Sequence, residues 1–500
     1  MQSAYILTKS KIITGLKCPR KLWFDVNSPI RKDSYLFHLG NRLGIFARSY
    51  YGAGFDLAGN LNAEDALAKT KMAISDPQVS VIYEAAFLFD ETLVRIDVLI
   101  RNGTSWEMVE VKSSAGVNDS HFDDAVIQTY IARKNGVNLD KVKISHINNN
   151  FVYKVRENYE GLLVEVDISE EIENRLPNVK AWIKKFSPIA TRGTSCPSVS
   201  MGAQCGSGPN KCVYTEKCES DLGPRPEVPV SILPHVGGRM SKEWAAKGIY
   251  DLRHLPPEAF NKPMQRIIQQ AHIDGKDWIR SELKNEIKRY PWPRFFMDFE
   301  TVQQGVPLVE NTKPKEKLPF QWSVHRWDSP SQKLELRSNA EFLEFTGAGL
   351  ERRFLTELIK SLETTGPIFA HNASFEQGIL KALCSKEECK DLKPAVDAIL
   401  ERVVCTLKMV REGFYSPKMN GSYSLKDVVK AIPDSVVFKS LVPLESDAEV
   451  ANGGDAMIAW FDYTDEITPE ANKKAIAESL KNYCAKDTFA MYQLMNYLIT

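Results

Sequence analysis

The chain has 500 residues, and at roughly 150 residues per domain this length predicts about three domains. Hydrophobic residues make up 43% and charged residues 26%, which excludes a disordered, fibrous or disulfide-stapled chain. Basic and acidic side chains number 64 each, so a polycation is excluded. Nucleic-acid binding is not excluded, because it depends on local charge.

The first 50 residues concentrate positive charge. They hold nine basic side chains against two acidic ones, and Arg20 and Lys21 are candidates for nucleic-acid contacts. No apolar stretch reaches the ~18–20 residues of a membrane span, and Lys9 and Lys11 interrupt the place of a signal-peptide core. A transit peptide is the alternative for this acid-poor start. We expect a cytoplasmic protein, without a membrane partner, whose nine cysteines stay reduced.

Two adjacent antiparallel strands are predicted on either side of a turn at 101–105, because both flanks alternate in strand fashion. Asp97 lies on one strand, and Glu110 and Lys112 share one face of the other because they are two residues apart. Carboxylates on neighbouring strands can share Mg²⁺ or Mn²⁺, and Lys112 can hold the attacking water. The pattern predicts metal-assisted phosphodiester hydrolysis, with a solvent-facing hairpin as the alternative.

Four further residues are candidates for this first site. The carbonyl of Val111 can add a metal ligand, and Glu84 on the preceding strand brings a third acid. A helix is predicted downstream, and its Gln128 and Tyr130 are candidates for contacts to Lys112 or to the nucleic-acid backbone.

Four cysteines form a second constellation: Cys18, Cys205, Cys212 and Cys218. The last three lie in a segment rich in Gly, Pro, Ser and Cys (191–229), which predicts a metal-ordered loop and a domain boundary near 222–229. Four thiolates can bind Zn²⁺ or a [4Fe–4S] cluster. The sequence around these cysteines lacks the paired C-x2–4-C knuckles that are typical of zinc sites. We interpret Cys196 as a free cysteine, and the later cysteines as core residues.

The order of these motifs along the chain resembles that of the RecB-type iron–sulfur nucleases of the PD-(D/E)xK superfamily. The motifs are the segment from Cys18 to Trp23, the D…ExK residues, Gln128 and Tyr130, and the three clustered cysteines. The resemblance covers about residues 1–222. It implies a restriction-endonuclease-like domain with a catalytic metal and a [4Fe–4S] cluster that staples the N-terminal arm to the end of the domain. The family often has a His four residues after a Gly in the first helical region, where this chain has Gly40 and Gly44.

The block from about 230 to 288 is predicted to be helical. Its pattern, including a glycine pair in the segment 237–240, resembles a helix-hairpin-helix module, which binds phosphates through backbone N–H groups. A helical spacer is the alternative. A second linker, Pro-Trp-Pro at 291–293, precedes a new α/β domain.

The C-terminal domain carries a third constellation of acids. Asp298 and Glu300 lie two apart on a buried strand, and Tyr483 and Asp487 lie four apart on a long helix, so each pair shares a face. Between these two pairs in the sequence, a predicted strand leads into a helix, and this segment contains Asn372 and Glu376. Such carboxylates can hold two divalent ions, one of which prepares water while the other stabilises the leaving oxygen, and Tyr483 would orient the water.

These three motifs resemble those of the DEDD proofreading exonucleases, in the variant with Y-x3-D. The resemblance implies an RNase H-like (DnaQ-like) 3′-to-5′ exonuclease domain, in which Asn372 contacts nucleic acid. Glu376 stands where relatives have Asp. The segment 421–428 (GSYSLKDV) resembles a signature of a bacterial family that joins this domain to the iron–sulfur nuclease.

We therefore predict an α/β multidomain nuclease with domains at 1–225, 230–288 and 290–500, two metal sites on one chain, and single strands or duplex ends as substrate. A catalytically degenerate iron–sulfur scaffold that binds nucleic acid is the alternative, and activity in only one half is a third possibility. The choice between DNA and RNA depends on 2′-OH contacts, which a sequence does not reveal.

Overall fold

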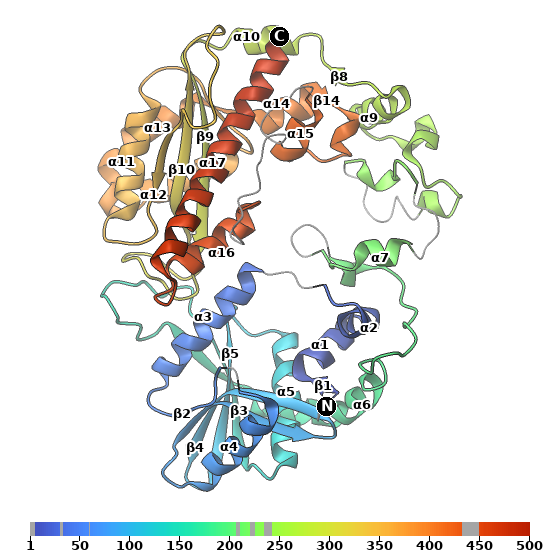
Figure 1. The fold of residues 1–500 in the computed structure, drawn as a ribbon, viewed down its shortest axis with the longest axis vertical. Coiled ribbons are helices and arrows are strands. Elements are labelled where there is room, and N and C mark those ends of the chain that lie inside the picture. Colours follow the sequence, from blue (N-terminus) through green and yellow to red (C-terminus); the bar gives the residue numbers. More distant parts are fainter. Residues whose placement is uncertain are drawn as a thin grey trace. The chain divides into compact units, whose positions relative to one another are not determined.

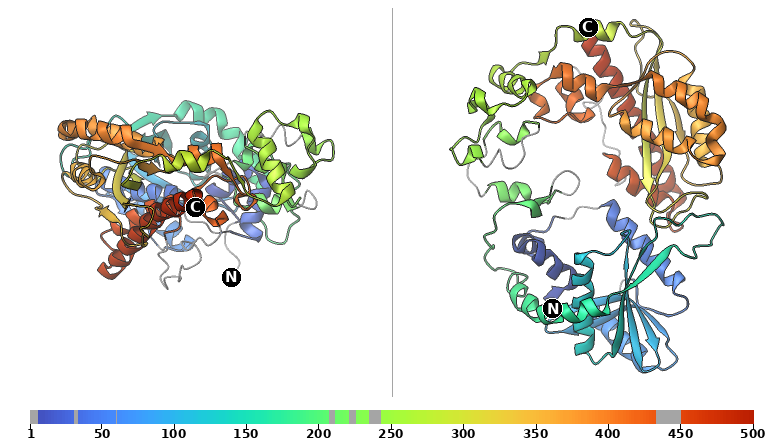
Figure 2. Two further views of the ribbon diagram at one scale, coloured as in Figure 1. Left: turned by 90° about the horizontal axis from the view of Figure 1, so that it is seen from above. Right: turned by 180° about the vertical axis from the view of Figure 1, so that it is seen from behind.

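The computed structural model describes residues 6–30, 34–59, 61–206, 211–220, 226–234, 243–432 and 450–500. The predicted glycine-pair segment at 237–240 lies outside these residues. The chain forms two compact α/β units (Figures 1 and 2). The first holds Met1–Gly223 with Gln304–Lys315, and the second holds Pro224–Gln303 with Glu316–Thr500. No helix of the described ranges is long and apolar enough to cross a membrane.

The first unit is built around a mixed sheet. Its strands follow the order β2 (Phe55–Asp56), β3 (Val81–Phe89), β4 (Thr92–Asn102), β5 (Ser105–Lys112), β6 (Leu139–Ile147) and β7 (Leu163–Asp167), with β1 (Leu7–Thr8) paired to β4. Strands β3, β4 and β5 form an antiparallel meander, and β6 runs parallel to β5. The predicted antiparallel pair is therefore confirmed as β4 and β5.

Helices pack on this sheet or beside it, and they decide which side chains meet. They are α1 (Lys9–Lys17), α2 (Pro19–Asn27), α3 (Tyr35–Tyr50), α4 (Ala63–Ser75), α5 (Asp119–Lys134), α6 (Ser169–Phe186) and α7 (Thr215–Ser220). Met108 of β5 packs with Ile127 of α5 in one buried cluster, whereas Val109 belongs to another cluster with Tyr51, just after α3. Because side chains alternate along a strand, Glu110 faces the same side as Met108, toward α5.

The segment 304–315 belongs to the first unit, although it connects two strands of the second. The backbone N–H of Tyr153 donates to the carbonyl of Thr312 at 3.0 Å, and the N–H of Asn311 donates back to Tyr153 at 2.7 Å. The Tyr159 hydroxyl donates to the carbonyl of Pro307 at 3.0 Å. The two units are therefore not consecutive stretches of sequence, a feature that the predicted boundaries did not include.

The second unit has a five-stranded sheet in the order β11 (Ala340–Leu343), β10 (Lys317–Trp327), β9 (Arg294–Gln303), β12 (Ile368–Ala370) and β13 (Val403–Cys405). Strands β9, β10 and β11 are antiparallel neighbours, and β12 and β13 run parallel to β9. Helices α11 (Leu350–Leu362), α12 (Ser374–Cys384) and α13 (Lys393–Arg402) lie on one face of the sheet, and α17 (Glu470–Ile499) lies on the other (Figures 1 and 2).

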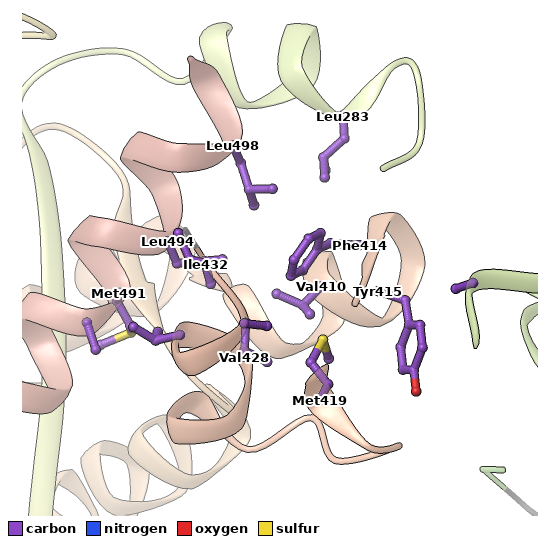
Figure 3. Packing of buried hydrophobic residues seen from close by; sticks show 14 of the residues in the cluster. Leu283, Val410, Phe414, Tyr415, Met419, Val428, Ile432, Met491, Leu494 and Leu498 are labelled. Carbon is purple, nitrogen blue, oxygen red and sulfur yellow. The ribbon is translucent and has the colours of Figure 1, made fainter. Parts of the chain in front are cut away.

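The middle block packs into the second unit rather than forming a separate module. It contains short 3-10 turns, α9 (Pro263–Asp274), β8 (Trp278–Ile279) and α10 (Leu283–Lys288), and β8 pairs with β14 (Phe414–Tyr415). Leu283 shares a buried core with Phe414 and with Leu498 of α17 (Figure 3). Helices α14 (Thr406–Gly413), α15 (Leu425–Ala431) and α16 (Gly453–Tyr463) complete the unit.

Candidate active sites

The second unit gathers three acidic side chains from two elements. Asp298 and Glu300 come from β9 and Asp487 comes from α17, and one oxygen of each carboxylate lies within 4.8 Å of the others. Within the described ranges, no other group of three His, Cys, Asp or Glu side chains brings its ligand atoms this close. The Asp298–Glu300 pair of β9 thus meets Asp487 where α17 packs against the sheet.

Glu376 joins this cluster from the first turn of α12. Its side chain is 2% exposed, and its Oε2 atom is buried without a hydrogen-bond partner within the described residues. Burial raises the pKa of Glu376 to about 8. Its charge also raises the pKa of Asp298 and of Glu300, which places it beside them. Glu376, the fourth predicted acid, therefore lies near the other three.

The cluster has far more negative than positive charge. Burial, followed by repulsion from Asp487, raises the pKa of Asp298 and Glu300 well above the usual values of such groups. Burial raises the pKa of Asp487 to about 6, although Lys426 acts in the opposite direction. Buried carboxylates are normally paired with cations or bound to metals. Hard oxygen ligands in this arrangement suit Mg²⁺ or Mn²⁺.

Tyr483 lies one helical turn before Asp487, and a hydrogen bond from its hydroxyl lowers the pKa of that carboxylate. The Lys426 ammonium of α15 lies 5.3 Å from the centre of the Tyr483 ring. The thiol of Cys484 lies 3.6 Å from the carbonyl oxygen of Asp298. Sequence reasoning missed Lys426 and Cys484 as neighbours of the acids. Lys426 could have been predicted from its place in the 421–428 signature. No local sequence pattern indicated that Cys484 lies beside the acids.

Asn372 ends the loop between β12 and α12 in a left-handed backbone conformation, with φ of 66°. Asn tolerates this conformation better than most residues. Its Oδ1 atom accepts a hydrogen bond from the Ser374 hydroxyl at 3.2 Å, and its side chain lines a cavity beside the first turn of α12. Asn372 therefore lies just before the helix that carries Glu376.

The first unit assembles the predicted D…ExK residues around Glu110, which is 1% exposed. Its Oε1 atom accepts hydrogen bonds from Lys112 Nζ at 2.7 Å and from Lys9 Nζ at 2.8 Å. Its Oε2 atom accepts from Gln128 Nε2 at 2.6 Å. Asp97 Oδ2 accepts from the Val111 N–H at 2.8 Å. The two acids thus lie on adjacent strands, as predicted.

The two acids of this pocket titrate in opposite directions. Burial alone would raise the pKa of Glu110, but Lys112 and Lys9 outweigh it and hold that pKa below its usual range. Burial, together with the charge of Glu110, raises the pKa of Asp97 to about 7. Glu110 is therefore already neutralised by Lys9 and Lys112.

A cavity of about 570 Å³ opens onto these residues. It is lined by Glu84, Asp97 and Glu110 from the sheet, and by Gly44 and Arg48 from α3. Glu84 has a left-handed backbone, with φ of 56°, and interrupts the pairing of β3 with β4 opposite Asp97. Such bulges are common beside active sites. A Cβ atom at Gly44 would meet nothing within 4 Å, so this helix face leaves open space.

Sequence reasoning missed two residues of this site. Asp124 forms an ion pair with Lys112, and its position one turn before Gln128 was a usable signal. Lys9 is separated from Glu110 by 101 residues, so no local pattern indicated it. Tyr130 does not line the cavity and packs near Phe89, because two residues along a helix point to different sides.

The four predicted cysteine ligands are half-buried and form no disulfide. Cys18 caps α2, since its sulfur accepts a hydrogen bond from the Lys21 N–H at 3.4 Å. Burial raises the pKa of Cys218, and Cys212, Cys18 and Cys205 raise it further, so the four thiols are neighbours. Arg20 lowers the same pKa. No three of these four described sulfurs lie within 4.8 Å of one another.

A family model described as a domain of unknown function (DUF2779) matches residues 295–424. The match includes Asp298, Glu300, Asn372 and Glu376, and it ends before Lys426 and α17. No curated protein matches the chain.

Proposed function

We propose that this protein is a metal-dependent nuclease whose second unit removes nucleotides from the 3′ end of single strands or duplex ends. The observation that carries the proposal is the group of Asp298, Glu300 and Asp487, whose carboxylate oxygens lie within 4.8 Å of one another, together with the buried Glu376 nearby. Two divalent ions held by such acids would activate water and stabilise the leaving oxygen. Tyr483, which is hydrogen-bonded to Asp487, would orient that water.

The sheet supports an RNase H-like domain of the DnaQ type. Three antiparallel strands followed by two parallel ones, with acids on the central strand β9, agree with the fold that the motif resemblance implies. Glu376 in place of Asp keeps the carboxylate and adds one methylene.

The first unit supports a second phosphodiesterase centre of the PD-(D/E)xK type. Asp97 and Glu110 would bind Mg²⁺ or Mn²⁺, and Lys112 would act on the attacking water. Glu110 forms ion pairs with both Lys9 and Lys112, so a metal ion that binds this carboxylate must compete with two lysines.

The four cysteines support an iron–sulfur cluster in the first unit. Tetrahedral zinc would hold its sulfurs about 3.8 Å apart, given Zn–S distances of about 2.3 Å. The four cysteines lack the paired C-x2–4-C knuckles typical of zinc, which weighs against it. A [4Fe–4S] cluster on Cys18, Cys205, Cys212 and Cys218 would tie α2 to α7 and act structurally.

The lysines around Glu110 favour one alternative, a catalytically degenerate first unit that serves as an iron–sulfur scaffold for nucleic acid. A buried carboxylate with three hydrogen-bond donors is stable without metal.

The test uses full-length wild type, Asp298→Asn, Glu110→Gln and the double variant. Each is incubated with Mn²⁺ and with 5′-labelled single-stranded DNA or RNA, and EDTA is the control. We expect wild type and Glu110→Gln to produce a ladder shortened from the 3′ end, and Asp298→Asn to lose it. If Asp298→Asn retains the ladder at the wild-type rate, the assignment to the second unit is wrong.

A further inference from the structure

A cavity of about 730 Å³ lies within the second unit, between the middle block and the sheet domain. We refer to it as the module cavity, because Lys262 and Gln265 of the middle block form one wall. The opposite wall consists of His371, Asn372, Arg411 and Tyr423. Its volume falls within the roughly 300–1,000 Å³ of small-molecule sites.

The lining of the module cavity is suited to an anion with a flat apolar part. Lys262 and Arg411 are exposed cations, and no carboxylate occurs in the described lining. Tyr423 and His371 contribute aromatic rings. The phenolic oxygen of Tyr423 is buried and has no hydrogen-bond partner within the described residues. A nucleotide combines the phosphate and the flat base that these groups would contact.

The walls of the module cavity are held in place by specific contacts. The Gln265 amide donates to the carbonyl of Pro234 at 2.8 Å. The His371 ring contacts the Thr406 hydroxyl at 3.0 Å and the Tyr423 carbonyl at 2.9 Å. Gly421 has φ of 77°, and a Cβ there would lie 2.1 Å from the carbonyl oxygen of Ile232. Only glycine therefore permits this approach of the loop to the middle block.

The module cavity adjoins the acids of the proposed exonuclease site at two points. Asn372 lines it and lies two residues before α12, whose first turn carries Glu376. Ser424 also lines it, and Lys426, two residues further on, lies over Tyr483. A strand with one phosphodiester at the acids can therefore place a neighbouring nucleotide in the cavity.

We propose that the module cavity binds a nucleotide next to the one that is removed, with Lys262 and Arg411 contacting its phosphate and Tyr423 its base. This inference rests on the proposed function of the second unit. It assigns the middle block a role in substrate binding and predicts that strands of more than one nucleotide are preferred.

The test compares two substrates in a full-length Glu110→Gln background, which silences the first unit. One is a single-stranded oligothymidylate, and the other is the p-nitrophenyl ester of thymidine 5′-monophosphate, which has only one nucleotide. We expect Arg411→Ala to lower the ratio of kcat/KM for the oligonucleotide to that for the ester about tenfold, the effect of losing one charged hydrogen bond. Lys408→Ala, three residues earlier on α14 and outside the cavity, is the matched control.

Binding of labelled oligothymidylate in EDTA provides a readout that does not need catalysis. We expect Arg411→Ala to reduce the slope of log Kd against log salt by about 0.7, the contribution of one phosphate contact on a single strand. Equal ratios and equal slopes for Arg411→Ala and Lys408→Ala would overturn the cavity assignment. If wild type hydrolyses neither substrate, the proposed function fails, and the salt slopes alone decide whether the cavity binds the strand.

Discussion

The ammonium of Lys426 lies 5.3 Å from the centre of the Tyr483 ring, and its charge lowers the pKa of both Asp487 and Glu300. This lysine comes from α15 and lies 57 residues before Tyr483 of α17 in the sequence. It is a positive group placed beside acids that would otherwise repel a phosphodiester.

We expect Lys426→Met to reduce 3′-end degradation about 10²-fold in kcat, because a preorganised positive charge near a developing oxyanion contributes on this scale. Lys418→Met, an exposed lysine shortly before α15, is the matched control and should behave like wild type. The measurement is single-turnover degradation with Mn²⁺. Equal rates for both variants would exclude a role for Lys426.

The acid cluster should make the metal-free protein less stable as pH rises. A carboxyl whose folded pKa is raised binds more protons in the folded state, so stability falls between its unfolded pKa near 4 and its folded value. Asp487 and Glu376, with pKa values of about 6 and about 8, set this window at roughly pH 4 to 8. We expect Tm in EDTA to decrease across that range.

The variant Glu376→Gln should flatten this pH dependence, since it removes one of the titrating carboxyls of the cluster. Glu401→Gln, an exposed glutamate on α13, is the control and should retain the wild-type curve. A pH-independent Tm of the wild-type protein in EDTA would contradict the raised pKa values of the cluster.

Divalent ions should stabilise the second unit only when the acids are intact. We expect Mn²⁺ to raise the Tm of wild type by mass action, and Asp298→Asn to show a higher Tm in EDTA but a much smaller shift with Mn²⁺. Differential scanning calorimetry with a manganese titration measures both effects. A wild-type shift that Asp298→Asn retains would show that the ions bind elsewhere.

In the first unit, Lys9→Met should destabilise the fold by about 2 kcal/mol, because Glu110 is buried and would lose one of two cationic partners. Lys17→Met, exposed at the end of the same helix, should have a small effect. Urea unfolding curves of the two variants measure the difference. Equal stabilities would mean that Lys112 alone satisfies Glu110.

The cysteine proposal is tested by anaerobic purification and visible absorbance. We expect an iron–sulfur absorption band in wild type, its loss in Cys205→Ser and Cys218→Ser, and its retention in Cys196→Ser, which alters an exposed cysteine outside the predicted set. Metal analysis that finds zinc and no iron would replace the iron–sulfur assignment with a zinc site.

Local geometry explains what the sequence by itself determined. Residues two apart on a strand or four apart on a helix share a face, so the Asp298–Glu300 and Tyr483–Asp487 pairs were predictable. The alternating pattern likewise predicted β4 and β5 and the approach of Asp97 to Glu110.

Tertiary packing decided the rest, because long-range contacts follow from which apolar faces are buried together and not from local spacing. Lys9 reaches Glu110 across 101 residues only because β1 pairs with β4. The middle block joins the core of the second unit through Leu283 and its neighbours, and the segment 304–315 joins the first unit through pairing with Tyr153. The sequence periodicity of these segments does not indicate which elements they pack against.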